Sequence, residues 1–398
     1  MKYMTVREAA RKWGVTEQLV QEYCAQGRIE GANKTNKTWE IPEGTEKPGS
    51  VQKVEAAVPL QNKQRAVHYP GLMPLMNTSF EPGHCMEYIT QMEEGQKKEI
   101  ALAEYHYFSG QAEKASMETE LYLTAEDTDI RLSACWIYAY ANLSLGHIHK
   151  ARYALSEVKS ILAADAKTLP EVKAAQAFVA AAAAVLLHLP LPDGLPPVRD
   201  YLSLLPPGVQ MFALYVQAHY TYLQEDYGRS LGIVETALVL QAEDYPIPAI
   251  YLHLVAVMDY MGLKQPKQAQ EHLLAAWDLA RPDDLIEGFG EHHGLLGGML
   301  EAVIKKDWPE DFKRIIAITY RFSAGWRKIH NSVTGHDVAD NLTTTEFAAA
   351  MLAARGWTNQ EIGNHMNISP NTVKRYISTA LQKLNISHRQ DLKKYMLR

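Results

Sequence analysis

Apolar residues recur every three to four positions through most of residues 83–335, and the breaks between these stretches fall at glycine or proline. This spacing is typical of amphipathic helices that bury one side. The pattern therefore predicts a mainly α-helical middle region. A phosphorylatable receiver domain, which needs strands and helices in alternation, is not expected there.

A repeat can be traced within this helical region. Four windows place aromatic and small apolar residues on one helix, then a polar turn, then a small residue inside a second helix. These small residues are Ala115, Ala151, Ser230 and Ala269. They lie 36, 79 and 39 residues apart, which leaves room for one weaker unit in the long gap.

The pattern resembles the tetratricopeptide-type helical hairpin, whose unit is about 34 residues, although the full Trp, Gly, Tyr and Pro signature is missing. The resemblance implies an α-solenoid of stacked hairpins with a concave face for a partner. The alternative is an irregular helical bundle. The tyrosines are then expected mostly to pack in the core. They are Tyr105, Tyr107, Tyr138, Tyr140, Tyr220 and Tyr222.

Capping signals mark the helix starts near the C-terminus. Three pairs have the spacing of a capping box, in which the first side chain and the residue three positions on bond each other's backbone. These pairs are Thr343 with Glu346, Thr358 with Glu361, and Ser387 with Gln390. Ser369 before Pro370 predicts a further start. Four short helices, the second and third joined by a three-residue turn, indicate a helix-turn-helix.

The third of these helices, over residues 370–384, has two distinct sides. Val373, Ile377, Leu381 and Leu384 follow the helical period and should face the core. The opposite side is expected to address base edges in the DNA major groove. It carries Asn371, Lys374, Arg375 and Ser378. Flanking residues could hold phosphates. They are Thr358, Asn359, Thr372, Tyr376 and Lys383. A merely solvated charged surface is the alternative.

The stretch "LTTTEFAAAMLAARGWTNQEIGNHMNISPNTVKRYISTALQKLNISHRQDL" resembles the LuxR-type (GerE-type) DNA-binding domain at nearly every signature position. The resemblance implies that Lys374, Arg375 and Ser378 contact bases, and that residues 388–396 pair two domains in a homodimer. It also assigns backbone contacts to Thr358, Asn359, Tyr376 and Lys383. Met366 replaces the usual Leu, and the combination of Arg375 with Ser378 leaves the operator sequence open.

The N-terminus has the same kind of pattern. Thr5 with Glu8 starts one helix, Gly14 and Val15 turn the chain, Thr16 caps a second helix, and Gly27 ends it. The segment "RIEGANKTNKTWEIP" then alternates around a polar tip, as a short β-hairpin does.

This order of helix, turn, helix and hairpin resembles the winged helix-turn-helix of the excisionase and MerR-like group. The resemblance implies DNA contacts from the second helix and from the wing. The candidate contacts are Thr16, Glu17, Gln18, Gln21, Lys34, Asn36 and Lys37. A protein-contact or vestigial role is the alternative for this short domain.

Charge supports nucleic-acid contact at both ends of the chain. The net charge is −6, yet residues 341–398 hold eight Lys or Arg against three Asp or Glu, and residues 1–41 hold seven against five. No apolar run is long enough for a membrane span, and no secretory signal opens the sequence. Cys24, Cys85 and Cys135 are widely spaced. We expect a cytoplasmic protein with unpaired thiols.

The sequence carries no recognisable enzymatic signature. There is no GxxxxGK[ST] P-loop, and the glycine-rich stretch over residues 287–300 lacks a preceding strand. Glu291, His292 and His293 are adjacent on a helix, where neighbours point in different directions, so a metal site is not expected. We therefore expect no cofactor, no metal and no enzymatic activity.

These patterns predict a mainly α protein in four parts. They are a winged helix-turn-helix (residues 1–48), a linker (49–82) with a "YPGLMPLM" half suited to docking, a helical repeat region (83–335) and a LuxR-type domain (338–398). The leading hypothesis is a sequence-specific bacterial transcription regulator that binds double-stranded DNA. Its helical region would receive a protein or small-molecule effector, or RNA polymerase. The alternatives are a protein-binding scaffold or anti-activator and an enzyme using residues 288–298.

Overall fold

The computed structural model describes residues 2–25, 29, 31–35, 38–45, 47, 71–163, 169–241, 243–334 and 341–396. The chain forms two compact units, Met1–Val67 and His68–Arg398, each with its own hydrophobic core. In the described ranges the larger unit is helical and the smaller one carries a sheet. The predicted mainly α fold class is confirmed.

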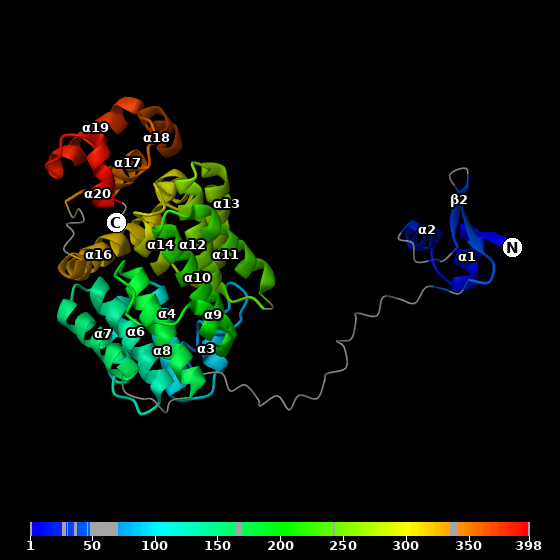
Figure 1. Cartoon of the computed structure of the whole chain (residues 1–398), viewed down its shortest axis with the longest axis horizontal. Coiled ribbons are helices and arrows are strands. Elements are labelled where there is room, and N and C mark those ends of the chain that lie inside the picture. Colours follow the sequence, from blue (N-terminus) through cyan, green and yellow to red (C-terminus); the bar gives the residue numbers. More distant parts are fainter. Residues whose placement is uncertain are drawn as a thin grey trace. The chain divides into compact units, whose positions relative to one another are not determined.

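The smaller unit combines two helices with a three-stranded antiparallel sheet (Figure 1), and its first helix packs on the sheet and on the second helix. Its elements are β1 (Tyr3–Thr5), α1 (Val6–Trp13), α2 (Glu17–Ala25), β2 (Asn33–Thr35) and β3 (Thr38–Pro42). β3 lies in the centre, with Met4 of β1 opposite Ile41 and Lys34 of β2 opposite Trp39. The hairpin of β2 and β3 was predicted, whereas β1 is too short to show a period of its own.

Local hydrogen bonds explain where the first helix begins and ends. The Thr5 hydroxyl accepts from the Glu8 N–H, and the Glu8 carboxylate accepts from the Thr5 N–H at 2.7 Å, which confirms the predicted capping box. Gly14 ends α1 with a φ of 67°, a left-handed conformation that suits glycine. Gly27, Asn36 and Lys37, for which roles were predicted, lie outside the described residues.

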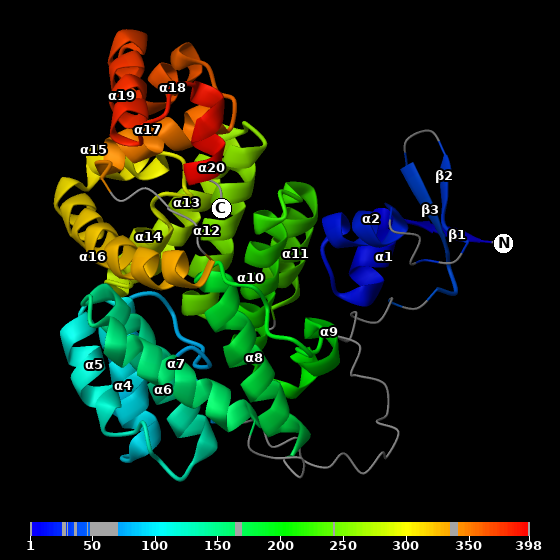
Figure 2. The same cartoon turned by 60° about the vertical axis from the view of Figure 1, so that its left-hand side comes forward.

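The larger unit is a body of helical hairpins with the C-terminal domain at one end (Figures 1 and 2). The helices of the body are α3 (Cys85–Gln91), α4 (Gln96–Phe108), α5 (Ala112–Glu120), α6 (Thr128–Ser144), α7 (Ile148–Ala163), α8 (Pro170–Leu186), α9 (Val198–Tyr201), α10 (Pro207–Leu223), α11 (Tyr227–Leu240), α12 (Pro246–Gly262), α13 (Pro266–Ala280), α14 (Glu287–His292), α15 (Lys305–Asp307) and α16 (Pro309–Thr334). Short 3-10 turns stand at Leu202–Leu204 and Arg281–Asp283, and a π-helix at Leu300–Ile304.

Four hairpin turns share one geometry. They join α4 to α5, α6 to α7, α10 to α11 and α12 to α13. In each turn one residue is left-handed, and the N–H of the residue after it donates to the carbonyl five residues earlier. The left-handed residues of these turns are Gly110, Gly146, Glu225 and Lys264. Five positions later stands the predicted small residue, which is fully buried in every case. Close contact between the two helices therefore accounts for the repeat.

In the long gap between the second and third repeat units lies α8, which is not followed by a second long helix. α8 ends in the same kind of turn, with His188 at a φ of 51° and the Leu189 N–H bonded to the Ala184 carbonyl at 2.8 Å. The following residues are rich in proline, which cannot continue a helix, and lead to the four-residue α9. His188 is thereby left beside α16 rather than under a second helix, with its ring against that of Trp326.

Part of the predicted linker packs against the body. From residue 71 the chain runs along α4 and α6, and Leu72, Met73 and Met76 are buried. The buried Glu104 carboxylate accepts from the N–H groups of Leu75 and Met76 at 3.0 and 2.9 Å. These bonds satisfy the backbone of a segment that has no helix or strand.

The C-terminal domain contains α17 (Thr344–Ala354), α18 (Asn359–Met366), α19 (Pro370–Lys383), a 3-10 turn at Arg389–Leu392 and α20 (Lys393–Met396). The capping boxes predicted at Thr343 and at Thr358 are both present, and Ser369 caps α19. Asn367 turns the chain between α18 and α19 at a φ of 55°. The predicted starts of these three helices are confirmed.

The fourth helical segment begins within the predicted stretch, but without the predicted capping box. Among the described residues the last segment begins as a 3-10 turn at Arg389, and no side chain caps it at His388. Tertiary contacts explain the difference. The Arg389 guanidinium donates to the Asn359 side chain and to the Trp357 carbonyl, and Leu392 is fully buried. These contacts set the backbone more strongly than a box between Ser387 and Gln390 would.

Candidate nucleic-acid interface

α19 is anchored in the domain core by one side only. Val373, Ile377 and Ala380 are buried, whereas Leu381 and Leu384, also predicted for the core, are partly buried. The Ser369 hydroxyl accepts from the Thr372 N–H at 3.1 Å and holds the first turn. Both views place this helix at the outer end of the larger unit (Figures 1 and 2).

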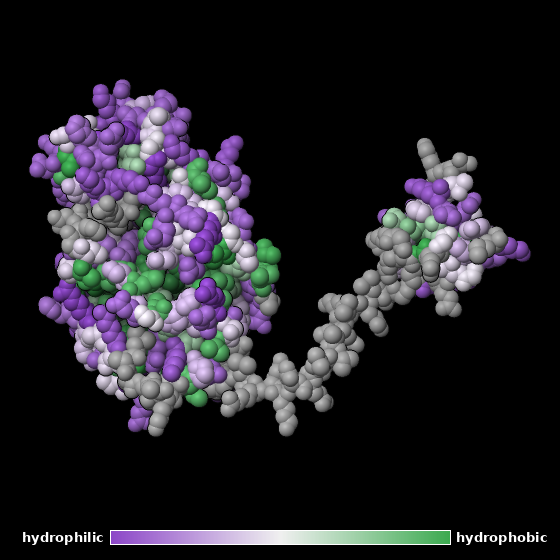
Figure 3. Space-filling model, in the orientation of Figure 1, coloured by the Kyte–Doolittle hydropathy of each residue, from purple (hydrophilic) through white to green (hydrophobic). Residues whose placement is uncertain are grey.

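The opposite side of α19 is exposed and polar. The predicted base-contacting residues all lie there, and each is exposed. They are Asn371, Lys374, Arg375 and Ser378. The guanidinium carbon of Arg375 stands 5.5 Å from the centre of the Tyr376 ring, so this cation rests beside an aromatic face. The surface that Figure 3 shows over the C-terminal domain is mostly hydrophilic.

The predicted backbone contacts divide into two groups. Thr358 is exposed and Thr372 and Tyr376 are half-exposed beside the polar side of α19. Two others have partners within the domain. The Lys383 ammonium lies 2.7 Å from the Glu346 carboxylate, and the Asn359 side chain accepts from Arg389 at 2.6 Å. A phosphate contact by either would therefore compete with an existing interaction.

The N-terminal candidates lie on two elements of the smaller unit. The Thr16 hydroxyl accepts from the Leu19 N–H at 3.3 Å, which confirms its predicted capping position. Glu17, Gln18 and Gln21 are exposed on α2. Lys34 of β2 is also exposed, and its ammonium stands 5.5 Å from the centre of the Trp39 ring.

The C-terminal domain docks on the body through polar contacts that the sequence did not reveal. The Arg355 guanidinium donates to the Tyr222 hydroxyl and to the Leu295 carbonyl. Lys264 donates to the Gly356 carbonyl at 2.8 Å, and His365 to the Gly297 carbonyl at 3.0 Å. No pattern in the chain points to Arg355, because its partners lie on segments far away in sequence.

Asp259 lies close to this docking contact and is completely buried on α12. Burial raises the pKa of its carboxyl to about 8. The nearby Ser230 hydroxyl, which donates to the Ala218 carbonyl, and the Arg355 guanidinium offset only part of this effect. The folded state therefore holds a proton that the unfolded chain, with an ordinary aspartate pKa, has already lost.

The raised pKa of Asp259 makes the stability of the fold depend on pH. A folded-state pKa above the unfolded value of 3.8 means that stability falls as pH rises from about 4 to 8, on the order of 1 kcal/mol per pH unit at most. Asp259→Asn, which cannot ionise, should raise the thermal midpoint more at pH 8 than at pH 5. Scanning calorimetry at both pH values, with the exposed Asp244→Asn as control, checks this. An equal effect at both pH values would contradict the buried proton.

The histidines of the glycine-rich stretch point in different directions, as expected. His293 contacts Glu301 at 2.7 Å, His292 contacts the Tyr215 hydroxyl at 2.8 Å, and the Glu291 carboxylate accepts from Tyr107 and Tyr251. Within the described ranges, no group of three or more His, Cys, Asp or Glu side chains could hold a metal ion. Nor does any helix in those ranges have the length and apolarity to cross a membrane.

Comparison with known proteins adds one finding. Residues 340–396 match the family model described as bacterial regulatory proteins, luxR family (GerE). No curated protein and no solved structure matches the chain. The C-terminal domain is thus a LuxR-type helix-turn-helix. This domain places the chain in the class of DNA-binding transcription regulators. That family is regulatory rather than enzymatic.

Proposed function

We propose that this chain is a sequence-specific transcription regulator in which α19 enters the major groove of its operator. The supporting observation is the division of α19 into a buried side and an exposed side that carries Asn371, Lys374, Arg375 and Ser378. An α-helix fits the major groove, where Arg or Lys can donate to guanine and Asn can pair with adenine. Thr358, Thr372 and Tyr376 would hold the flanking phosphates.

Two modules add to this function. The N-terminal unit would supply a second DNA contact through α2 and the β2–β3 hairpin, with Gln18, Gln21 and Lys34 exposed on them. The last segment would pair two chains on a two-half-site operator. Lys393 of that segment lies 2.8 Å from Glu225 of the body, and Met396 is buried. Pairing through these side chains would therefore require the body to release them.

Selection of bound fragments from random-sequence DNA tests this proposal. The full chain should enrich one motif with two related half-sites. Its affinity should fall with salt, with a log–log slope of about −0.9 for each phosphate neutralised. Selection that enriches no motif, at low salt as well as at physiological salt, would reject sequence-specific binding.

A second candidate function is binding of a protein partner by the helical body. A groove of about 900 Å³ between α7, α8 and the end of α16 favours it. The groove has apolar side chains such as Leu155, Leu187 and Ile329, and Arg152 and Lys173 stand among its lining residues. An acidic amphipathic helix has the matching chemistry. Recovery of one stoichiometric partner, together with no DNA protection at moderate salt, would favour this function over the first.

A further inference from the structure

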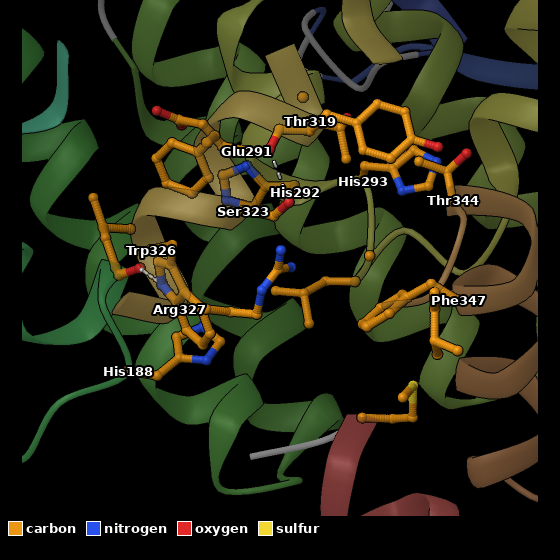
Figure 4. Close-up of a pocket in the computed structure, with 18 of the residues that line it drawn as sticks. His188, Glu291, His292, His293, Thr319, Ser323, Trp326, Arg327, Thr344 and Phe347 are labelled. Carbon is orange, nitrogen blue, oxygen red and sulfur yellow. Dashed lines mark hydrogen bonds between the residues drawn. The ribbon is translucent and has the colours of Figure 1, made fainter. Parts of the chain in front are cut away.

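A cavity of about 170 Å³ lies where the C-terminal domain meets the body. The body contributes parts of α6 and α10, the end of α8, the turn after α14 and one side of α16. The C-terminal domain contributes Leu342, Thr344, Phe347 and Met396. Figure 4 shows His188 and Trp326 on one side of this space and Phe347 on the other. A molecule that fills the cavity would thus touch both the body and the DNA-binding domain.

Tyr140 of α6 brings an unpartnered hydroxyl to the lining of this cavity. The residue is 3% exposed, and its hydroxyl forms no hydrogen bond with any described residue. Burial and the nearby Glu291 carboxylate raise the pKa of Tyr140 well above its usual value, so the hydroxyl keeps its proton. Buried polar groups in folded proteins nearly always have a partner. The Tyr140 hydroxyl is therefore available as a donor to a ligand.

A chain of hydrogen bonds fixes the protonation of three histidines at the cavity. The Gly288 carbonyl can only accept, so His292 Nδ1 donates to it at 2.7 Å. Burial lowers the pKa of His292 to about 4, which leaves its Nε2 to accept from the Tyr215 hydroxyl at 2.8 Å. The Tyr215 oxygen then accepts from His219 Nδ1, and His219 Nε2 accepts from His188 Nε2, both at 3.3 Å.

This chain ends in an acceptor at His188. Burial lowers the pKa of His219 and brings that of His188 to about 3, so both rings are neutral at neutral pH. Because the proton of His188 is on Nε2, its Nδ1 can only accept, and no described residue donates to it. The cavity lining therefore includes a donor at Tyr140 and an acceptor at His188 that have no partner among the described residues.

The charged groups of the lining are already engaged. The Glu291 carboxylate accepts from two tyrosine hydroxyls, and His293 contacts Glu301 at 2.7 Å. Arg327 also lines the cavity and has an interaction of its own. A charged ligand would lose its hydration without gaining a free counter-charge, and Glu291 would in addition repel an anion. The lining therefore favours an uncharged ligand.

Aromatic rings form the wall on the body side. The Trp326 ring lies parallel to that of His330, with centroids 4.5 Å apart and 9° between the planes. The His188 ring meets Trp326 edge-on at 5.1 Å. Trp326 is held in place because its indole N–H donates to the Leu186 carbonyl at 3.0 Å. A flat aromatic ring is the shape that packs well against such a wall.

We propose that this cavity binds a small uncharged phenol, whose hydroxyl accepts from Tyr140 and donates to His188 Nδ1 while its ring packs against Trp326. A hydroxyl is suited to both groups because it donates and accepts through one oxygen. The size agrees, since a protein cavity of about 150 Å³ accommodates benzene. The regulatory part of this inference rests on the proposed function. Because lining residues such as Phe347 belong to the DNA-binding domain, occupancy would alter how that domain is held by the body.

NMR titration of the full chain with phenol, anisole and toluene tests the site. We expect saturable binding of phenol at one site per chain. Anisole, which accepts but cannot donate, should bind roughly 3- to 10-fold more weakly because one hydrogen bond is lost. Toluene, which does neither, should bind more weakly again. Benzoate, which carries a charge, should bind more weakly than phenol.

Tyr140→Phe removes the hydroxyl and keeps the ring. It should weaken phenol and anisole binding roughly 3- to 10-fold, while toluene affinity stays at the parent value because toluene makes no hydrogen bond. The thermal midpoint should not fall, since no described residue bonds this hydroxyl. Tyr138→Phe makes the same change two residues earlier on α6, outside the cavity lining, and should leave the binding of all three molecules unchanged.

A second variant keeps the test decisive if Tyr140→Phe disturbs folding. Ser323→Leu places a larger side chain at the cavity and should abolish the binding of phenol and toluene alike, with a thermal midpoint near that of the parent. Equal affinity for phenol and toluene, tighter binding of benzoate than of phenol, or unchanged phenol binding in both variants overturns the proposal. So does the absence of any phenol binding to the parent chain.

Operator affinity with and without phenol separates this inference from the proposed function. A severalfold change that disappears in Ser323→Leu supports coupling of the cavity to DNA binding. Phenol binding through Tyr140 in a chain that selects no DNA motif would reject the proposed function and leave the ligand site standing. Phenol binding with unchanged operator affinity would reject the coupling.

Discussion

Lys374→Glu is expected to lower affinity for the selected operator by roughly 10- to 100-fold or more. Loss of one base or phosphate contact from the recognition helix costs about 1–3 kcal/mol, and the new carboxylate would add repulsion from the phosphates. The substitution should leave the fold intact because Lys374 is exposed on α19. Fluorescence anisotropy with labelled operator, at two salt concentrations, measures the effect.

Lys114→Glu is the matched control for this prediction. Lys114 is exposed on α5, far from α19 within the larger unit (Figure 2), and its replacement makes the same change in net charge. Affinity close to the parent value is expected for it. If Lys374→Glu also binds like the parent, the polar side of α19 does not contact DNA. If both variants lose affinity equally, long-range charge rather than contact explains the loss.

Gly325→Ala should be strongly destabilising. Gly325 lies in α16 where that helix meets α6, and a Cβ there would overlap the Leu143 carbonyl oxygen. A backbone atom cannot rotate away as a side chain can, so the two helices must separate. Overpacking costs about 1–3 kcal/mol and occasionally more. A clear drop in the thermal midpoint, followed by circular dichroism, is the expected result.

Gly232→Ala provides the comparison. Gly232 is also within a helix, α11, but a Cβ there would meet no atom within 4 Å. Alanine should therefore stabilise that helix by roughly 0.5–1 kcal/mol. Opposite shifts in the two variants support the close packing of α16 on α6. Stabilisation by Gly325→Ala would mean that these helices are not in contact.

Local capping chemistry made the C-terminal domain predictable. The hydroxyls of Thr343, Thr358 and Ser369 each accept from the N–H three residues ahead, so the signal and its effect lie within one helical turn. The same locality explains why the two sides of α19 were recognised: burial of Val373 and Ile377 repeats with the helical period. The exposure of neighbouring residues such as Lys374 follows from the same helical period.

Predictions were weaker where a contact joins distant parts of the chain. β1 exists because β3 pairs with it, and its three residues carry no pattern of their own. The backbone after Ser387 is positioned by the hydrogen bonds of Arg389 and the burial of Leu392, not by a local capping box. Lys383 was expected at a phosphate, yet Glu346 lies beside it from the start of another helix.

The sequence by itself determined the helical character of the middle region, the starts of α17, α18 and α19, the small residues of the hairpins and the polar side of α19, because these depend on interactions within a few residues. Only the tertiary structure decided where Arg355 docks, that α8 is not followed by a second helix of a hairpin, and that Arg327 and Phe347 line one cavity. The physical reason is that packing between distant segments depends on shape and burial, which leave no regular spacing along the chain.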